Sequence, residues 1–208
     1  MIYICYNGYA QILGNWGVKM GAKGLATDKR ILDAAQELFS ERGFSAVTMK
    51  DICLEAHISR GGLYRHYSST SIIFTAIIER EQKMAFASLQ RAKDGEVSPD
   101  KILNVYLEHR MNNILESTFG IDNAITEFAS NSKGGAEIAK KRAKDCLKVI
   151  EELIEMGNEK GIYNCKHVRS TAKHICFVIE GMCKHSVILP VTQKDVDGQM
   201  KLINKMLK

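Results

Sequence analysis

The sequence predicts an all-α fold, in which an amino-terminal three-helix unit is joined by a long helix to a larger helical domain. Apolar residues recur at helical spacing along most of the chain, and glycines or short polar clusters separate the periodic segments. Only Pro99 and Pro190 occur among the 208 residues, which favours long helices because proline disrupts helix interiors. No strand pattern and no internal repeat competes with this interpretation.

The first helix is predicted to begin after Thr27, whose hydroxyl is suited to cap a helix amino terminus. It is predicted to end at Gly43, because Arg42 places a cation in the last turn and glycine accepts a left-handed conformation. The apolar residues that define its buried face are Ile31, Leu32, Ala35, Leu38 and Phe39.

Two short helices are predicted next. Thr48 and Asp51 form a TxxD capping arrangement that opens the second helix, and Ser59 is suited to cap the third, which runs through Tyr67. Leu63 and Tyr67 are expected to pack into the core of this small unit. About four residues separate the two helices, a spacing typical of a helix-turn-helix.

A long fourth helix is predicted to start in the polar cluster from Ser68 to Ser71 and to link the two halves of the chain. The stretch 92–99, with Gly95 and Pro99 as helix breakers, is predicted to be a loop. Further helices are predicted over residues 100–117, 121–131, 135–160, 167–189 and 193–207.

The formal net charge is +5 and the isoelectric point is near 8.8. This charge does not by itself indicate nucleic-acid binding, because most of the excess cations lie in the carboxy-terminal part of the chain. Residues 20–70 contain 7 Lys and Arg against 6 Asp and Glu, whereas residues 133–208 contain 15 against 9. Bulk charge therefore does not decide the function.

The composition predicts a cytoplasmic protein with free thiols. The six cysteines form no CxxC pair, and no segment approaches the roughly 18 apolar residues of a membrane helix. Residues 1–22 lack helical periodicity and do not have the order of a signal peptide, so a flexible amino-terminal extension is expected there.

The most specific pattern lies between Gly43 and Thr70, where a helix end, a capped short helix, a turn and a second short helix follow one another. As one ordered string, this segment closely resembles the TetR family of helix-turn-helix transcriptional regulators. The matching residues are Gly43, Phe44, Thr48, Ile52, Ser59 and the string Gly62, Leu63, Tyr64, Arg65, His66 and Tyr67.

The resemblance implies that residues 23–70 are a DNA-binding domain and that the protein is a regulator rather than an enzyme. No carboxylate occurs from Ile58 to Thr70 to repel phosphate. Arg60 stands in the first turn of the recognition helix, where a side chain can reach base edges. By resemblance, Tyr64 and His66 would contact phosphates, and Thr48 and Lys50 would anchor the second helix. The candidate DNA-binding residues are Thr48, Lys50, Ser59, Arg60, Gly61, Gly62, Tyr64, Arg65 and His66.

Two positions depart from the family pattern. His57 stands where a turn glycine is usual, and a left-handed conformation costs more for histidine than for glycine. Thr70 stands where a phosphate-binding lysine is common, which puts one backbone contact in doubt.

For residues 71–208 the resemblance implies a helical ligand-binding and dimerisation domain. The expected protein is a homodimer formed through the last two helices, which represses at a palindromic double-stranded DNA operator and is released by a small-molecule inducer. No cofactor and no membrane partner are expected. The candidate inducer pocket consists of Phe86, Tyr106, His109, Met111, Phe128 and Cys146.

Two alternatives remain open. A metal or redox sensor could use the carboxy-terminal residues Cys165, His167, His174, Cys176, Cys183 and His185. Helical phase places the three histidines on one stripe and Cys176 and Cys183 on the opposite face, so a metal site would need a second helix or subunit. A cysteine–histidine enzyme with Glu127 or Glu180 as base is the weaker alternative, because no catalytic or nucleotide motif is present.

Overall fold

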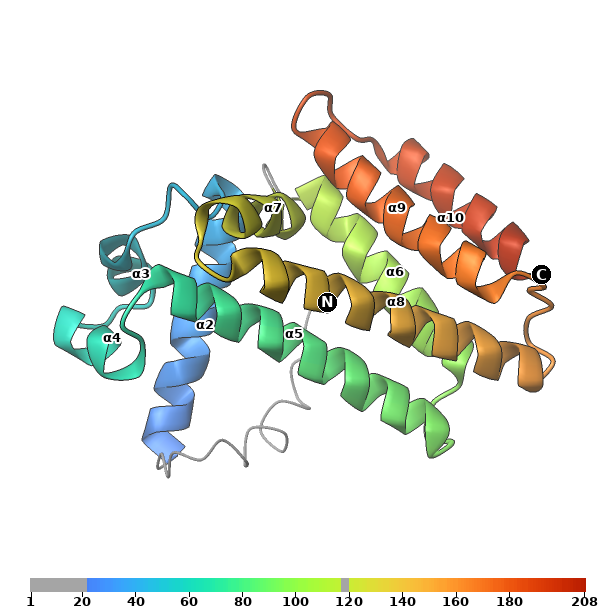
Figure 1. Ribbon diagram of the computed structural model, residues 1–208, viewed down its shortest axis with the longest axis horizontal. Coiled ribbons are helices and arrows are strands. Elements are labelled where there is room, and N and C mark those ends of the chain that lie inside the picture. Colours follow the sequence, from blue (N-terminus) through green and yellow to red (C-terminus); the bar gives the residue numbers. More distant parts are fainter. Residues whose placement is uncertain (1–21, 117–119) are drawn as a thin grey trace.

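The computed structural model describes residues 22–116 and 120–208, and within these ranges the chain forms helices and connecting segments without strands, which confirms the predicted all-α fold (Figure 1). The predicted extension lies outside the described residues apart from Ala22, where the first described helix begins. The helices are α2 (Ala22–Arg42), α3 (Met49–Glu55), α4 (Arg60–His66), α5 (Thr70–Lys93), α6 (Pro99–Glu116), α7 (Ile121–Asn131), α8 (Gly135–Glu159), α9 (Val168–Ser186) and α10 (Gln193–Leu207).

The helices form two groups at opposite ends of the molecule. Helices α2, α3 and α4 gather at one end, and α5 leaves them to run side by side with α8 (Figure 1). At the other end α9 and α10 pack together and lie against α6 and α8 (Figure 1). We call α2 to α4 the reading head and α5 to α10 the regulatory half, after the roles that the sequence predicts for them.

The predicted starts of three helices are confirmed by their caps. Thr48 and Asp51 form a complete capping box, in which the Thr48 backbone N–H donates to the Asp51 carboxylate at 2.9 Å. The Ser59 hydroxyl accepts from the Gly62 backbone N–H at 3.1 Å, and the Ser69 hydroxyl accepts from that of Ile72 at 3.3 Å. These side chains satisfy backbone donors that a helix start leaves open.

Two predicted helix limits are wrong. Helix α2 begins at Ala22, so Thr27 lies inside it and does not cap it. The preceding alanine, lysine and leucine residues are good helix formers, and they outweigh the single Gly24. Helix α9 ends at Ser186 rather than at residue 189. Pro190 explains this, because proline disfavours the helical conformation of the residue before it.

Two hydrophobic clusters form the core. The first joins the reading head to the start of α5 and to α7, where Ile121, Ala124, Ile125 and Phe128 are buried. The second lies between α5, α6, α8, α9 and α10. The domain boundary predicted at residue 70 falls inside the first cluster, so the reading head shares its core with parts of the regulatory half.

The turn between α3 and α4 contains a non-glycine residue in the left-handed region. His57 has φ 50° and an exposed side chain, and its carbonyl lies 3.5 Å from Arg30 Nη2. The backbone turn needs this conformation, because the Ile58 N–H donates back to the Cys53 carbonyl at 3.0 Å. A Cβ atom in this region is strained.

We predict that His57→Gly stabilises the protein by about 1 kcal/mol, because glycine removes the Cβ strain of the left-handed conformation. Urea denaturation followed by circular dichroism measures the change in the free energy of unfolding. His57→Ala is the matched control, since alanine removes the imidazole but keeps the Cβ atom, and it should not stabilise. A His57→Gly variant less stable than the starting protein contradicts the prediction.

Candidate nucleic-acid interface

One side of helix α4, the predicted recognition helix, is buried and the other side is exposed. Leu63 is completely buried and Tyr67 is half-buried against the first core cluster, as predicted. On the outer side Arg60 and Arg65 are exposed, and Tyr64 has 55% of its side chain exposed. The helix therefore presents two cations and a phenol to solvent with no carboxylate among its own residues.

The two glycines of α4 differ in what a side chain at their position would contact. A Cβ atom at Gly62 would lie 3.2 Å from the Ser59 hydroxyl oxygen, so glycine lets the cap close. A Cβ atom at Gly61 would meet nothing within 4 Å. No contact in the described part of the chain requires glycine at position 61, and glycine costs about 1 kcal/mol in a helix relative to alanine. An external surface that approaches the backbone closely would explain it.

Thr48 caps the start of α3 and Lys50 lies in its first turn, and both residues are exposed. The Thr48 hydroxyl donates to Asp51 at 2.5 Å, and these hydrogen bonds hold the pKa of the Asp51 carboxyl below its usual value. Thr48 thus has a demonstrated role as a cap. Lys50 is the exposed cation of α3.

His66 is oriented differently from the other predicted contact residues. Only 14% of its side chain is exposed, and its Nδ1 lies 3.7 Å from the Asp28 carboxylate of α2. The Tyr67 hydroxyl donates to the same carboxylate at 2.6 Å, and burial followed by this bond raises the pKa of Tyr67. His66 and Tyr67 therefore tie α4 to α2, which sequence reasoning did not predict.

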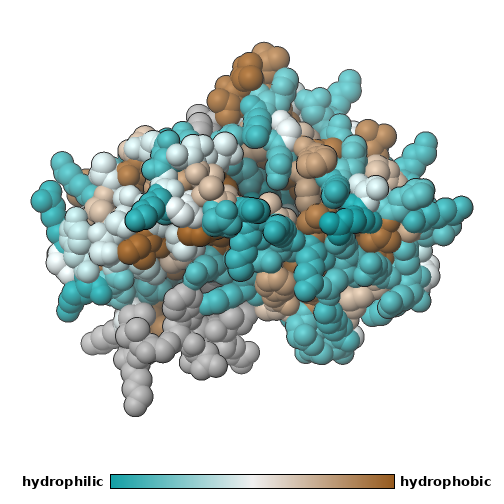
Figure 2. Space-filling model, viewed as in Figure 1, coloured by the Kyte–Doolittle hydropathy of each residue, from teal (hydrophilic) through white to brown (hydrophobic). Residues whose placement is uncertain are grey.

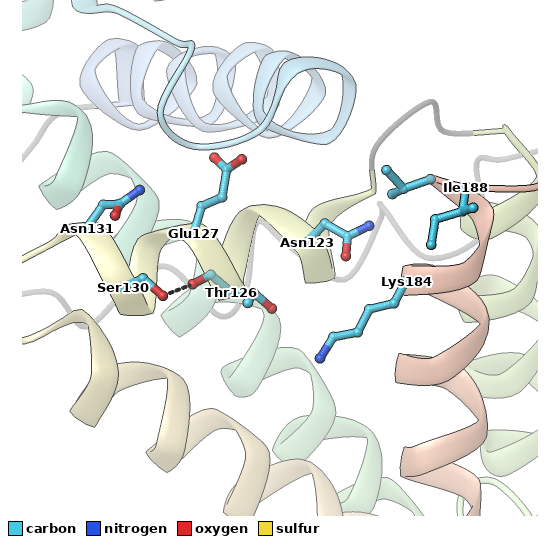
Figure 3. A pocket seen from close by; sticks show the side chains of 8 residues that line it. Asn123, Thr126, Glu127, Ser130, Asn131, Lys184 and Ile188 are labelled. Atoms are coloured by element: carbon cyan, nitrogen blue, oxygen red, sulfur yellow. Dashed lines mark hydrogen bonds between the residues drawn. The ribbon is translucent and has the colours of Figure 1, made fainter.

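Helix α7 is hydrogen-bonded to the reading head. The Glu127 carboxylate accepts from the Ser45 backbone N–H at 2.9 Å, and the Asn131 amide donates to the Ser45 hydroxyl at 3.0 Å. In Figure 3, Glu127 points from α7 toward the segment of the reading head above it. The Gly120 N–H also donates to the Ser40 carbonyl at 2.8 Å. Glu127 thus attaches α7 to the reading head, and this contact gives no support to its alternative interpretation as a catalytic base.

A surface hollow of about 400 Å³ lies between α7 and the end of α9. In Figure 3, Lys184 reaches across it from α9, and Asn123, Thr126 and Ser130 lie along its α7 side. None of the six residues predicted to line an inducer pocket borders it. A second hollow, of about 440 Å³, is bordered by Cys165, Lys166, His167, Ser170, Thr171, His174 and Met206.

The structure places the six predicted pocket residues in different surroundings. Phe128 is buried in the first core cluster and Met111 in the second, because each completes a packed layer between helices. Phe86 and His109 are exposed. Tyr106 packs against the same cluster as Met111, and Cys146 and the buried Arg110 of α6 are its electrostatic neighbours.

Sequence reasoning missed a group of four charged residues inside the regulatory half. Arg110 of α6 binds Asp122 of α7, and Arg142 of α8 contacts both Asp122 and Glu81 of α5 at 3.3 Å. Burial opposes ionisation of Asp122, but Arg110 and Arg142 lower the pKa of its carboxyl below the usual value. The only signal in the sequence was a set of charges at positions with helical spacing toward the core.

The carboxy-terminal cysteines and histidines are not assembled into a site. In the part of the chain that the structure describes, no group of three or more His, Cys, Asp or Glu residues is placed to hold a metal. Burial raises the pKa of Cys183 and raises that of Cys176 to about 12, which opposes thiolate formation. The metal and redox alternatives therefore gain no support. None of the described helices is long and apolar enough to cross a membrane.

Comparison with known proteins identifies the amino-terminal part of the chain. The family model for bacterial regulatory proteins of the tetR family matches residues 31–77. The HTH-type transcriptional regulator UidR of Escherichia coli strain K12 is 41% identical over 76 residues, which cover 36% of this chain. The matched segment spans only 39% of the length of UidR.

Solved structures with the same fold cover most of the chain. The regulatory protein TetR of Rhodobacter sphaeroides superposes with a TM-score of 0.70 at 15% identity, over 88% of this chain and 99% of that one. A complex of SmeT with triclosan superposes with a TM-score of 0.64 at 22% identity, over 88% and 90%. The family match falls on the helix-turn-helix, and the shared fold extends through the remaining helices. The amino-terminal part of this chain thus matches the tetR family of bacterial regulatory proteins, and its described helices share the fold of the solved regulator from Rhodobacter sphaeroides.

Proposed function

We propose that the protein is a transcriptional regulator that binds an operator through α3 and α4 of each subunit of a homodimer. In this proposal residues 23–70 read the DNA and residues 71–208 dimerise and bind a ligand. The observation that carries the proposal is the outer face of α4, where Arg60, Tyr64 and Arg65 are exposed and carboxylates are absent. Such a surface attracts the phosphate backbone and fits the major groove.

The roles of the contact residues follow from their placement. Arg60 is the first residue of α4, where a long side chain reaches base edges, so we assign it to base recognition. Lys50, Tyr64 and Arg65 are exposed around it and are assigned to the phosphate backbone. His66 is assigned to positioning α4 through Asp28, in addition to the phosphate contact that the family resemblance implies.

Dimerisation through α9 and α10 is supported by exposed apolar side chains on these helices. Phe177 is 67% exposed, Leu202 is 53% exposed and Met206 is 38% exposed. Figure 2 shows a further hydrophobic projection at the top of the molecule, where the connection between α9 and α10 exposes Val187, Ile188 and Leu189. A second copy of the same surface would cover these groups in a symmetric interface.

Release by a ligand is the third part of the proposal. The solved SmeT complex contains triclosan, so one protein with this fold binds a small organic molecule. In the present chain α5 and α7 of the regulatory half each contact both α2 of the reading head and α8, so a ligand that shifts either helix would tilt α4. Such a tilt would change the spacing of the two reading heads on a palindromic operator and weaken repression.

We predict different effects for the exposed residues of the reading head. Arg60→Ala should relax base preference and cost about 1–3 kcal/mol of operator binding for each half-site. Lys50→Ala should weaken binding to all sequences about equally and reduce its salt dependence by about one phosphate contact per subunit. Fluorescence anisotropy with labelled duplexes over a series of salt concentrations measures both quantities.

The operator for this assay comes from selection of random duplexes at about 150 mM salt followed by sequencing. Lys160→Ala is the matched control, because Lys160 is exposed at the far end of α8 and should leave binding unchanged. Failure to enrich a palindrome would contradict the proposed function. Wild-type affinity of both Arg60→Ala and Lys50→Ala would contradict the assignment of residues.

We predict that Phe177→Glu converts the dimer into monomers at micromolar concentration. The symmetric interface would then bury two carboxylates, one from each subunit, and each subunit would lose a central apolar contact. We expect these changes to weaken association by about 4 kcal/mol. Analytical ultracentrifugation measures the dissociation constant. Lys173→Glu, an exposed charge change on the same helix, is the control for net charge. An unchanged dimer in Phe177→Glu would move the interface to another surface.

A further inference from the structure

The buried charge cluster of the regulatory half contains one guanidinium that is poorly satisfied. Arg110 and Asp122 bind each other closely, and each side chain is only 12% exposed. Arg142 is 8% exposed, and its two contacts with carboxylates both use Nη2 at 3.3 Å. Its Nε is buried and has no hydrogen-bond partner among the residues that the structure describes.

This geometry is unusual for a buried arginine. Charge-assisted hydrogen bonds are ordinarily about 2.7–2.9 Å long, and a guanidinium commonly offers a carboxylate two parallel donors. Arg142 instead shares one terminal nitrogen between Glu81 and Asp122 and leaves Nε unused. The guanidinium therefore has a donor available for a carboxylate placed differently from either of its present partners.

Glu81 is the partner that can leave. Its side chain is 29% exposed and belongs to α5 at the edge of the cluster, whereas Asp122 is 12% exposed and contacts both arginines. A carboxylate with access to solvent is rehydrated when it moves outward, so its loss from the cluster costs less than the loss of Asp122. The two guanidiniums would then face one carboxylate, and the cluster would carry a single uncompensated positive charge.

Two neighbours of the cluster, Tyr106 and Cys176, are uncharged. The Tyr106 ring lies 5.9 Å from Arg110 Cζ, and burial raises the pKa of the Tyr106 phenol. Cys176 lies within electrostatic range of both arginines, and its pKa of about 12 keeps it a neutral thiol. Two neutral, polarisable side chains and one excess positive charge suit a small organic molecule with one negative charge.

We propose that Arg142 is a receptor for the carboxylate of a small organic acid, and that the chain's own Glu81 occupies this receptor when the acid is absent. The ligand would replace Glu81 and engage both Nη2 and the unused Nε of Arg142. This inference rests on the proposed function for its regulatory meaning, because it names the ligand class of the regulatory half.

Replacement of Glu81 would act on the helix that carries the reading head. The adjacent residue of α5, Arg80, donates to Asp33 and Gln36 of α2, both at 2.7 Å. Loss of the Glu81 contact removes one tie between α5 and α8 and leaves α5 attached to α2. The ligand therefore favours a state in which α5 and the reading head move together relative to α8.

The test uses acetate, because Glu81→Ala removes a fragment of about the size of acetate. In the full-length protein we expect sodium acetate to raise the thermal unfolding midpoint of Glu81→Ala more than sodium chloride of equal ionic strength does. Its dissociation constant for acetate, measured by calorimetry, should be at least about tenfold lower than that of the wild type, in which Glu81 competes for Arg142. Adding Arg142→Gln should abolish the difference between acetate and chloride.

Two further variants keep the result interpretable. Glu81→Gln retains the length of the side chain and should also bind acetate more tightly than the wild type, so the test does not depend on one variant folding well. Glu155→Ala, the same substitution at an exposed position of α8, should respond to acetate as the wild type does. Equal effects of acetate and chloride on both Glu81 variants would overturn the proposal. So would an acetate effect that survives Arg142→Gln.

Operator binding is measured separately on the same proteins. We expect Glu81→Ala to bind the operator at least about threefold more weakly, since it lacks the tie between α5 and α8. Intact operator binding without any acetate response would overturn the Arg142 site alone. Acetate binding without operator binding in any variant would overturn the proposed function and leave the site standing.

Discussion

Four phenylalanine rings hold the reading head on the rest of the molecule. Phe39 and Phe44 belong to the reading head, Phe74 to α5 and Phe128 to α7, and all four are at least nine-tenths buried. Neighbouring ring centroids lie 4.8 Å apart for Phe39 and Phe74 and 5.0 Å apart for Phe44 and Phe128. Close packing of this kind resists sliding, because a displaced ring leaves a void. The direction in which α4 faces is therefore tied to the positions of α5 and α7.

The proposed DNA-binding surface depends on this anchorage because its own helices are short. Helices α3 and α4 have 7 residues each, too few to persist in water without tertiary support. Caps at Thr48 and Ser59 satisfy their first backbone donors, and the buried Ile52 and Leu63 attach them to the aromatic cluster. The exposed cations of α4 can be held at a fixed orientation only because the opposite side of the helix is buried.

Local features of the fold could be predicted from the sequence, and contacts between distant segments could not. The capping box at Thr48 depends on residues three positions apart, and the end of α2 depends on the adjacent Arg42 and Gly43, so both were recognisable. The Asp33–Arg80 and Glu81–Arg142 pairs join residues 47 and 61 positions apart, and many other cations and carboxylates could have paired equally well. The error at Thr27 has a related cause, since helix propensity of the preceding residues outweighed a suitable cap.

The same distinction applies to the candidate sites. The outward face of α4 follows from helical spacing once Leu63 is taken as buried, so Arg60, Tyr64 and Arg65 were placed correctly on the surface. The orientation of His66 depends on Asp28, 38 positions earlier, and was not predictable from the recognition helix itself. The proposed inducer pocket depended on which apolar residues face one another across four helices. Periodicity gives the buried face of each helix but not its neighbour.

Adjacent positions on α5 join the two halves of the molecule through opposite charges. Successive residues of a helix point about 100° apart, so Arg80 can reach α2 while Glu81 reaches α8. The head-side pair is tighter, at 2.7 Å for Arg80 and Asp33 against 3.3 Å for Arg142 and Glu81. Of the two ties, the one to α8 is thus the easier to exchange. A ligand that competes for Arg142 shifts the equilibrium between the two positions of α5 only through the difference between its affinities for them. Because the contact of Glu81 with Arg142 is the weaker tie, a smaller difference in affinity is enough to move α5.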